Sequence, residues 1–225
     1  MISVALPLLV LAGGFGTRLK SVVSDVPKPL APIGQSPFLR YLMDVWIRQG
    51  IQNFVFLLHH EAEKIADFAE SYKKRFAPYI QIDCIVESSA LGTGGSVANA
   101  VRERNLSKDF LVVNADTWLS GGIAEIISKK PPAIAIIEVE NSDRYGQVKF
   151  TGDMITEFVE KKNSSGKSWI NAGLYHLDAS LFSDWNGESF SLETHLFPQL
   201  VKAKTLKTCP IVADFTDIGI PDDYD

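Results

Sequence analysis

The residues best suited to chemistry lie near the amino terminus, where a cluster of glycines is followed by a cation. Gly13, Gly14 and Gly16 come directly after an apolar run. Glycine lets a backbone turn sharply and approach a ligand with no Cβ in the way. Thr17 and Arg18 then add a hydroxyl group and a guanidinium. Main-chain N–H groups together with a guanidinium predict a turn that binds a chain of phosphate groups.

Lys28 supplies a second cation near this glycine loop, in the stretch V-P-K-P over residues 26–29. Pro29 disfavours helical geometry at the residue before it, and both proline rings stiffen the loop. A lysine on a stiff loop beside a phosphate-binding turn predicts chemistry on phosphate groups. Two other glycine motifs do not fit, because Leu19 stands where a dinucleotide-binding pattern needs its third glycine, and no G-K-[ST] follows. The alternative is an ordinary glycine turn with an exposed arginine and lysine.

Two aspartates are candidates for a metal site. Asp116 follows the apolar run 110–114, and Asp217 has a similar setting within residues 215–221. Mg²⁺ prefers one or two carboxylates together with phosphate oxygens, so this pair predicts one Mg²⁺ held against a polyphosphate. Taken alone, each aspartate is more typical of a solvated loop or a helix cap.

Alternating strand and helix patterns must position these residues. Apolar runs predict strands at residues 6–12, 53–58, 80–86, 110–114 and 133–139, and helical spacing predicts helices at 38–48, 62–76, 95–104 and 123–128. This rhythm predicts an α/β fold, a three-layer, Rossmann-like, mostly parallel (mixed) sheet with helices on both faces. Ligands bind beyond the carboxyl ends of the strands in such sheets. The glycine loop, Glu87, Asp116 and Lys161 each follow a predicted strand, so we expect them on one rim.

From about residue 145 the pattern changes. Short strands at 147–150 and 155–159 flank Gly152 and Asp153, which predicts a hairpin. Residues 163–168 are predicted to form a polar loop, 171–177 a strand and 190–200 a helix. The length predicts one domain over residues 1–225, in which 141–225 complete a pocket formed by 1–140.

The composition argues against several classes of protein. A net charge of −5 disfavours nonspecific nucleic-acid binding, which depends on basic patches. No apolar run reaches the roughly 18 residues that cross a membrane, and residues 1–10 lack the basic start of a signal peptide.

Cys84 and Cys209 lack metal-binding spacing and are expected as reduced thiols. The four histidines also lack such spacing, which favours solvated or core-bonded roles. We therefore expect a cytoplasmic protein with no nucleic-acid or membrane partner.

The pattern G-G-x-G-T-R-L over residues 13–19, followed by P-K-P over 27–29, resembles the signature of the sugar-1-phosphate nucleotidyltransferases. Further segments match in order as far as Tyr224: L-G-T-G-G at 91–95, R-Y-G at 144–146, F-V-E-K at 158–161, N-A-G at 171–173 and F-S-L-E at 190–193. The resemblance is strongest to the heptose 1-phosphate guanylyltransferase group. It implies a GT-A-like fold, a nucleoside triphosphate and a sugar 1-phosphate as substrates, an NDP-sugar and pyrophosphate as products, Mg²⁺ as cofactor, and possible homo-oligomers.

The same resemblance implies roles for individual residues. Arg18, Lys28 and Asp116 correspond to catalytic positions, and Asp116 with Asp217 to the metal site. Residues that correspond to the nucleotide site are Leu11, Ala12, Gly13, Gly14, Gly16, Thr17, Glu87, Gly92, Thr93 and Asn114. Residues that correspond to the sugar-phosphate site are Gly146, Glu160, Lys161, Asn171 and Glu193. Glu193 has a second interpretation, because Ser191 could cap a helix with Glu193 in its first turn, which would make Glu193 structural. Ala115 replaces the glycine usual in the family, which leaves the local turn less defined.

The Glu87 side chain indicates which nucleobase the protein binds. A carboxylate can accept hydrogen bonds from both N1–H and N2–H₂ of guanine, whereas uracil and thymine offer one such donor. We therefore predict GTP, with D-glycero-D-manno-heptose 1-phosphate as the sugar, for surface glycan synthesis. The alternatives are a mannose-1-phosphate guanylyltransferase, a uridylyl- or thymidylyltransferase, or a regulatory subunit that senses sugar nucleotides. A regulatory relative is expected to lack Arg18, Lys28 or a metal aspartate, and this chain keeps them.

Overall fold

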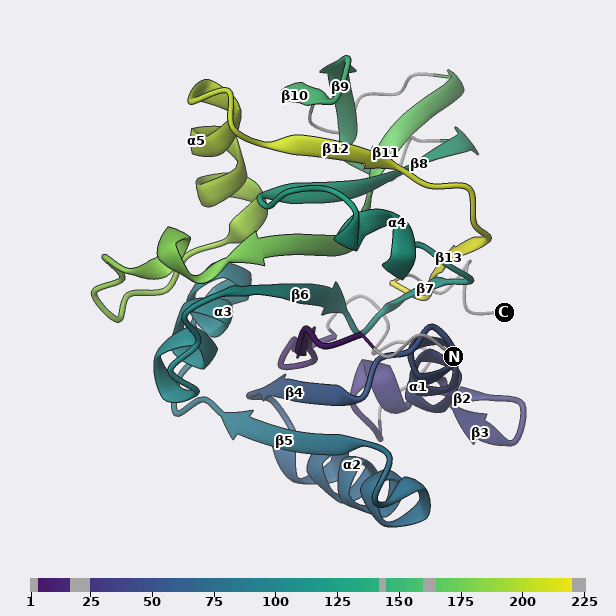
Figure 1. The fold of residues 1–225 in the computed structure, drawn as a ribbon. Coiled ribbons are helices and arrows are strands. Elements are labelled where there is room, and N and C mark those ends of the chain that lie inside the picture. The colour runs from purple at the N-terminus through teal and green to yellow at the C-terminus, as the bar shows by residue number, and fades with distance from the viewer. Residues whose placement is uncertain (1–3, 17–24, 142–144, 160–164, 220–225) are drawn as a thin grey trace.

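A nine-stranded mixed sheet forms the centre of the molecule (Figure 1). The computed structural model describes residues 4–16, 25–141, 145–159 and 165–219. The strand order is β5-β4-β1-β6-β11-β8-β12-β10-β9. These strands are β1 (Leu8–Leu11), β4 (Asn53–Leu58), β5 (Gln81–Val86), β6 (Asp109–Asn114), β8 (Ala133–Asn141), β9 (Gln147–Thr151), β10 (Met154–Val159), β11 (Ser165–Asp178) and β12 (Lys207–Pro210).

The half of the sheet that follows the βαβ rhythm is parallel. β1 lies between β4 and β6, and β4 in turn pairs with β5, all in parallel register. The chain therefore leaves β1 toward one side of the sheet for β4 and β5, and returns to its other side with β6. A reversal of this kind leaves a crevice beyond the carboxyl ends of β1 and β6, where open α/β sheets bind their ligands.

The other half of the sheet is largely antiparallel. β11 pairs antiparallel with both β6 and β8, and β9 and β10 form the predicted hairpin. β12 runs parallel to β8. Because β11 lies between β6 and β8, residues after 141 are inserted into the sheet built by residues before it. The boundary near residue 140 within a single domain stays a prediction.

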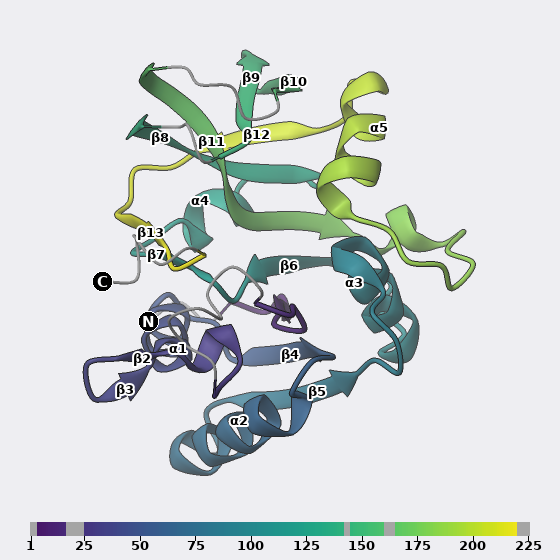
Figure 2. The same ribbon diagram turned by 180° about the vertical axis from the view of Figure 1, so that it is seen from behind.

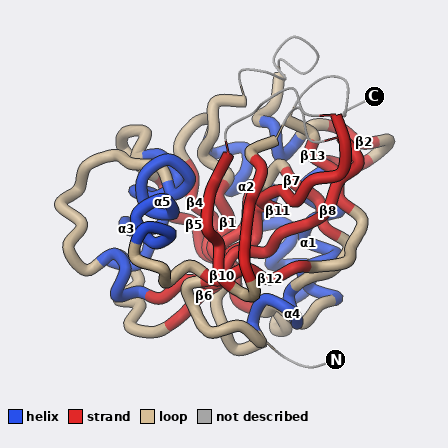
Figure 3. Tube along the Cα trace, turned by 90° about the horizontal axis from the view of Figure 1, so that it is seen from above, coloured by secondary structure: helices blue, strands red, loops and turns tan. Residues whose placement is uncertain are grey.

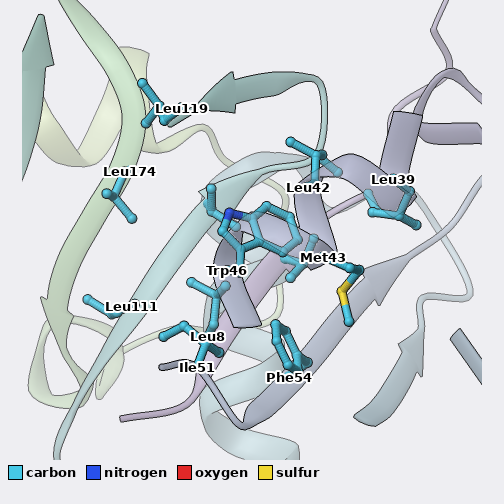
Figure 4. Packing of buried hydrophobic residues seen from close by; sticks show 14 of the residues in the cluster. Leu8, Leu39, Leu42, Met43, Trp46, Ile51, Phe54, Leu111, Leu119 and Leu174 are labelled. Carbon is cyan, nitrogen blue, oxygen red and sulfur yellow. The ribbon is translucent and has the colours of Figure 1, made fainter. Parts of the chain in front are cut away.

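The helices are α1 (Phe38–Arg48), α2 (Ala62–Phe76), α3 (Gly92–Glu103), α4 (Ile123–Ile127) and α5 (Phe197–Lys202). Neighbouring residues of a strand point to opposite faces, and accordingly Leu8 and Val10 of β1 join one buried cluster while Leu9 joins another. Apolar side chains of α1, α2 and α4 pack in the first cluster, and Figure 4 shows Leu42 and Trp46 of α1 there. Those of α3 and α5 pack in the second. Figure 3 shows α3 and α5 on one side of the strands, and α1 and α4 on the other.

Two short antiparallel ribbons lie outside the central sheet. β2 (Pro32–Ile33) pairs with β3 (Ser36–Pro37), and β7 (Thr117–Leu119) pairs with β13 (Phe215–Asp217). The second ribbon is visible beside α4 in Figure 2. It ties the carboxyl-terminal part of the chain to the segment that follows β6.

The structure corrects several element boundaries. α3 begins at Gly92 and not at residue 95, so the L-G-T-G-G segment is its first turn. β11 begins at Ser165, inside the segment 163–168 predicted as a loop, because residues 165, 166 and 168 pair with β8. The helix predicted at 190–200 consists of a π-helical turn, η3 (Leu192–Leu196), followed by α5. The described residues also form two 3₁₀ turns, η1 (Lys28–Leu30) and η2 (Ala179–Phe182).

Two predictions from composition can be followed in the structure. Both cysteines lie in strands and are free thiols, Cys209 buried in β12 and Cys84 partly buried in β5. Burial raises the pKa of both thiols. Within the described residues, no helix is both long enough and apolar enough to cross a bilayer.

Candidate active site

A cavity of about 380 Å³ opens beyond the carboxyl ends of β1, β4, β5 and β6. Every residue of the predicted nucleotide site that the structure describes lines it: Leu11, Ala12, Gly13, Gly14, Gly16, Glu87, Gly92, Thr93 and Asn114. Lys28 and Asp116 line it as well. Thr17 and Arg18 lie outside the described residues. The rim predicted from the strand pattern therefore gathers these segments around one cavity.

Some residues that line the cavity were not predicted from the sequence to belong to the site. His59 follows β4 and lines the cavity, and its Nδ1 lies 3.1 Å from the main-chain oxygen of Glu87. Phe15, which is 49% exposed, packs edge-on against the His59 ring. The position of His59 directly after a parallel strand was the available signal, because that position places a side chain on the same rim as the glycine loop.

The ammonium group of Lys28 lies between two carboxylates at the edge of the cavity. Its Nζ is 2.6 Å from Asp116 Oδ2 and 4.0 Å from Asp217 Oδ1. Only 9% of the Lys28 side chain is exposed, so solvent screens this charge poorly. Asp116 Oδ1 also accepts a hydrogen bond from the Thr117 hydroxyl group. The lysine and the aspartate pair that the sequence predicted as site residues thus form one cluster.

The β7–β13 ribbon explains how residues far apart in the chain meet here. Its register places Asp217 opposite Thr117, next to Asp116. The N–H of Ile218 donates to the main-chain oxygen of Asp116 at 3.1 Å. The N–H of Gly219 donates to Asp217 Oδ1 at 2.6 Å, which orients that carboxylate. A Cβ at position 219 would lie 3.1 Å from Lys28 Nζ, so glycine keeps this space open.

The backbone at Lys28 differs from the prediction. Lys28 is the first residue of the 3₁₀ turn η1 and is therefore helical, although Pro29 follows it. Proline is tolerated in the first turn of a helix because the N–H groups there have no partner within the helix. Pro27 precedes the turn in an extended conformation, and Pro29 is buried. The expected stiff loop is thus a short turn held by a proline on each side.

The carboxylate of Glu87 is largely buried at the cavity wall. The residue is 8% exposed, and its Oε2 accepts the N–H of Leu91 at 3.2 Å. Within the described part of the chain, no hydrogen bond reaches its Oε1. One oxygen therefore orients the carboxylate, and the other makes no hydrogen bond to the residues that the structure describes.

The first turn of α3 packs directly against Phe190. The N–H groups of Gly94 and Gly95 donate to the Phe190 main-chain oxygen at 2.9 and 3.2 Å. A Cβ at Gly92 would lie 2.6 Å from that same oxygen, and the φ angle of Gly92 is +71°, a region that favours glycine. The glycines of L-G-T-G-G therefore allow the F-S-L-E segment to approach α3 closely.

We expect Gly92→Ala to destabilise the protein more than Gly152→Ala. Both glycines have positive φ angles, +71° and +60°, but a Cβ at Gly152 would meet no atom within 4 Å. Alanine at position 152 costs only the backbone strain of a positive φ angle, about 1 to 2 kcal/mol of unfolding free energy. Alanine at position 92 costs the same strain and, in addition, the clash of its Cβ with the Phe190 main-chain oxygen. Urea unfolding of both variants measures the difference. Equal losses would show that the approach of Phe190 contributes nothing.

The segment predicted to line the sugar site adjoins the cavity at Asn114. Gly173 has a φ of +72°, and a Cβ there would lie 3.0 Å from Asn114 Nδ2. The β11–β8 register shifts between Asn171 and Tyr175, an irregularity of the kind that redirects side chains next to active sites. Asn171 Nδ2 donates to the Tyr175 hydroxyl oxygen at 2.9 Å. Burial raises the pKa of Tyr175 well above 10, so it stays a neutral phenol.

The remaining residues of the predicted sugar site are less closely gathered. Gly146 is exposed, just before β9. Glu193 lies in η3, where its Oε2 accepts hydrogen bonds from the hydroxyl groups of Thr93 and Ser191. Ser191 caps this turn, as the structural interpretation of Glu193 expected. Glu160 and Lys161 lie outside the described residues, so their part in the site stays a prediction.

Comparisons with known proteins decide the family. The model of the family described as "Nucleotidyl transferase" matches residues 8–225. The chain belongs to this family. The match confirms the resemblance carried by the glycine loop and the P-K-P segment.

Individual members of the nucleotidyl transferase family are similar over nearly the whole chain. D-glycero-alpha-D-manno-heptose 1-phosphate guanylyltransferase of Campylobacter jejuni is 31% identical, with 96% of both chains covered. Mannose-1-phosphate guanyltransferase 2 of Candida glabrata is 30% identical over 96% of this chain and 62% of its own length. The crystal structure of HddC from Yersinia pseudotuberculosis complexed with GMP-PN superposes with a TM-score of 0.84 and 35% identity, covering 97% of this chain and 96% of that one.

Proposed function

We propose that the protein is a sugar-1-phosphate guanylyltransferase, which converts GTP and a sugar 1-phosphate to a GDP-sugar and pyrophosphate. The observation that carries the proposal is the Lys28 ammonium between two carboxylates, at the edge of a cavity that the glycine loop lines. Relatives named as guanylyltransferases support it. So does the related structure in complex with GMP-PN. A mixed α/β sheet of the GT-A-like kind, in three layers, is the fold we infer for this activity.

The reaction needs no base from the protein. The second pKa of a phosphate monoester is about 6, so the sugar 1-phosphate is largely a dianion at neutral pH. One of its oxygens attacks the α-phosphorus of GTP and forms the new P–O bond. The bond from that phosphorus to the β-phosphate oxygen breaks, and pyrophosphate leaves with the electron pair. The enzyme must therefore align two anions and offset their repulsion.

Three cations of the chain are suited to that work. Lys28 stands at the cavity edge, where it would neutralise the α-phosphate. Arg18 would bind the leaving β- and γ-phosphates, and Lys161 would bind the sugar phosphate. The last two roles come from the sequence motifs alone. Cations held in place before the reaction stabilise developing charge without reorganisation.

Asp116 and Asp217 would hold Mg²⁺. The donor set fits this ion, because Mg²⁺ takes one or two carboxylates and completes its coordination with water and substrate phosphates. Within the described residues, no third acidic, histidine or cysteine side chain joins the pair. When bound, the ion supplies a positive charge that screens the phosphates. The carboxylates hold their positions through the hydroxyl group of Thr117 and the N–H of Gly219.

Glu87 is the residue we propose to select guanine, through its Oε1. In Glu87→Gln, the amide oxygen can still accept the hydrogen bond from the Leu91 N–H. The NH₂ group then faces the N–H donors of guanine and cannot accept hydrogen bonds from them. Hydrogen bonds to charged groups contribute about 1.5 to 3 kcal/mol, so we expect kcat/KM for GTP to fall roughly 10- to 100-fold. Pyrophosphate release from GTP and UTP measures the change, with the exposed Glu103→Gln as matched control. Unchanged preference for GTP in Glu87→Gln would remove this assignment.

The sugar and the setting are finer proposals. Heptose 1-phosphate is the sugar substrate we favour, and mannose 1-phosphate is the alternative that a relative's name supports. We propose that the enzyme works in the cytoplasm and that its GDP-sugar product is used for surface glycan synthesis. Assembly into homo-oligomers is a further proposal that comes from the family resemblance. A regulatory subunit without catalysis is the competing proposal. The retained cluster of Lys28, Asp116 and Asp217 favours catalysis over it.

A further inference from the structure

Thr93 lines the cavity, yet its hydroxyl group is bonded to another part of the chain. Its Oγ1 donates to Glu193 Oε2 at 2.7 Å and accepts the N–H of Leu192 at 2.9 Å. A threonine hydroxyl has one proton to donate. That proton is committed to Glu193, so Thr93 contributes a link between two protein segments.

Ser191 completes this arrangement. Its hydroxyl group donates to the same Oε2 of Glu193 at 2.8 Å and accepts the N–H groups of Glu193 and Thr194, both at 3.1 Å. Hydrogen bonds to an ionised carboxylate are about twice as strong as neutral ones. Thr93, Ser191 and Glu193 together are called the clasp below.

The clasp fastens the first turn of α3 to η3. Main-chain contacts of Phe190 join the same two segments, because its oxygen accepts from Gly94 and Gly95 and its N–H donates to Leu91. In the glycine turn 92–95, Gly92 and Thr93 line the cavity, the glycines approach Phe190 and the residues just before it, and Thr93 bonds to η3. The hydrogen bond between Thr93 and Glu193 thus links the cavity wall to a segment about 100 residues away in sequence.

We propose that Glu193 is a positioning residue of the nucleotide site, which acts through Thr93 on the glycine turn, and that it does not bind the sugar phosphate. This inference rests on the proposed function, since it takes the cavity as the nucleotide site. Glycine has more backbone freedom than any other residue, so a turn rich in glycine needs external contacts to keep one conformation. Among the described hydrogen bonds between these two segments, loss of the clasp leaves those of the Phe190 main chain, and we expect nucleotide binding to weaken.

The first test compares Thr93→Val, Glu193→Ala and the double variant in steady-state kinetics. We expect each to raise the KM for GTP roughly tenfold and to leave the KM for the sugar 1-phosphate within about twofold. Because the residues act as one unit, the double variant should lose no more than either single variant. Thr93→Ser, which keeps the hydroxyl group, should recover most of the GTP affinity. Thr194→Val, an exposed change beside Glu193, is the matched control.

The second test needs no substrate. Amide hydrogen exchange of Leu192, Gly94 and Gly95, whose N–H groups join the two segments, should quicken in Thr93→Val and Glu193→Ala and stay unchanged in Thr194→Val. Thermal unfolding of each variant identifies any that fail to fold.

A rise in the KM of the sugar 1-phosphate in Glu193→Ala, with the KM for GTP and amide exchange unchanged, would overturn the proposal and make Glu193 a sugar ligand. Additive losses in the double variant would also overturn it. If the wild-type protein released no pyrophosphate with any substrate pair, the proposed function would fail. Amide exchange would still decide whether the clasp holds the turn.

Discussion

Replacing Lys28 by alanine is expected to lower kcat by about 30- to 1,000-fold at saturating substrate, which corresponds to about 2 to 4 kcal/mol of lost transition-state stabilisation. The physical reason is the poor screening of a cation that is 9% exposed at the edge of the cavity. The charge that develops on the α-phosphate is largest in the transition state, so the loss falls on kcat more than on KM. Pyrophosphate release under saturating GTP and sugar 1-phosphate measures it.

Lys149→Ala is the matched control for this variant. Lys149 forms an exposed ion pair with Glu157 between β9 and β10, with Nζ and Oε2 2.8 Å apart, and exposed pairs contribute little to stability. We expect wild-type kcat from the control, and thermal unfolding near the wild-type value from both. Full activity of Lys28→Ala would contradict the mechanism, since no other described cation lines the cavity.

Asp116→Asn has the second large effect. Asparagine keeps the shape and can still accept the Thr117 hydroxyl bond, but it removes the charge that would bind Mg²⁺ and that pairs with Lys28. We expect kcat to fall about 100- to 1,000-fold, comparable to the loss of a preorganised electrostatic contact. The Mg²⁺ concentration for half-maximal rate should rise as well. Rates measured across a Mg²⁺ titration give both quantities.

Asp153→Asn makes the same chemical change at an exposed position in the β9–β10 hairpin and should leave rate and Mg²⁺ dependence unaltered. Calorimetric titration of Mn²⁺ in the presence of GTP provides a readout without turnover, in which Asp116→Asn should bind the ion more weakly. A wild-type Mg²⁺ profile in Asp116→Asn would mean that Asp116 is no metal ligand.

The local elements were readable from the sequence because each depends on neighbouring residues. The apolar spacing of 38–48 and 62–76 gave α1 and α2 with the observed bounds, and the run 53–58 gave β4. Segment 165–168 was misread, since its polar side chains show no apolar run, and cross-strand bonds to β8 made it a strand. Here tertiary pairing outweighed local preference.

Long-range contacts in the site were beyond sequence reasoning. The glycine motifs predicted the cavity wall, and strand position predicted that Glu87 and Asp116 would share a rim. Nothing in the sequence indicated that Phe190 would fill the space left by Gly92 and Gly94. The place of β11 between β6 and β8 was equally hidden, because strand order depends on how distant segments pair.

The measurement that tests the central claim most directly is pyrophosphate release by the wild-type protein with Mg²⁺. GTP, CTP, UTP, dTTP and ATP would each be paired with heptose, mannose, glucose and N-acetylhexosamine 1-phosphates. We predict release with GTP, fastest with heptose 1-phosphate, and little with the other nucleotides. Release from no pair, together with tight binding of a sugar nucleotide, would contradict catalysis and favour a regulatory protein.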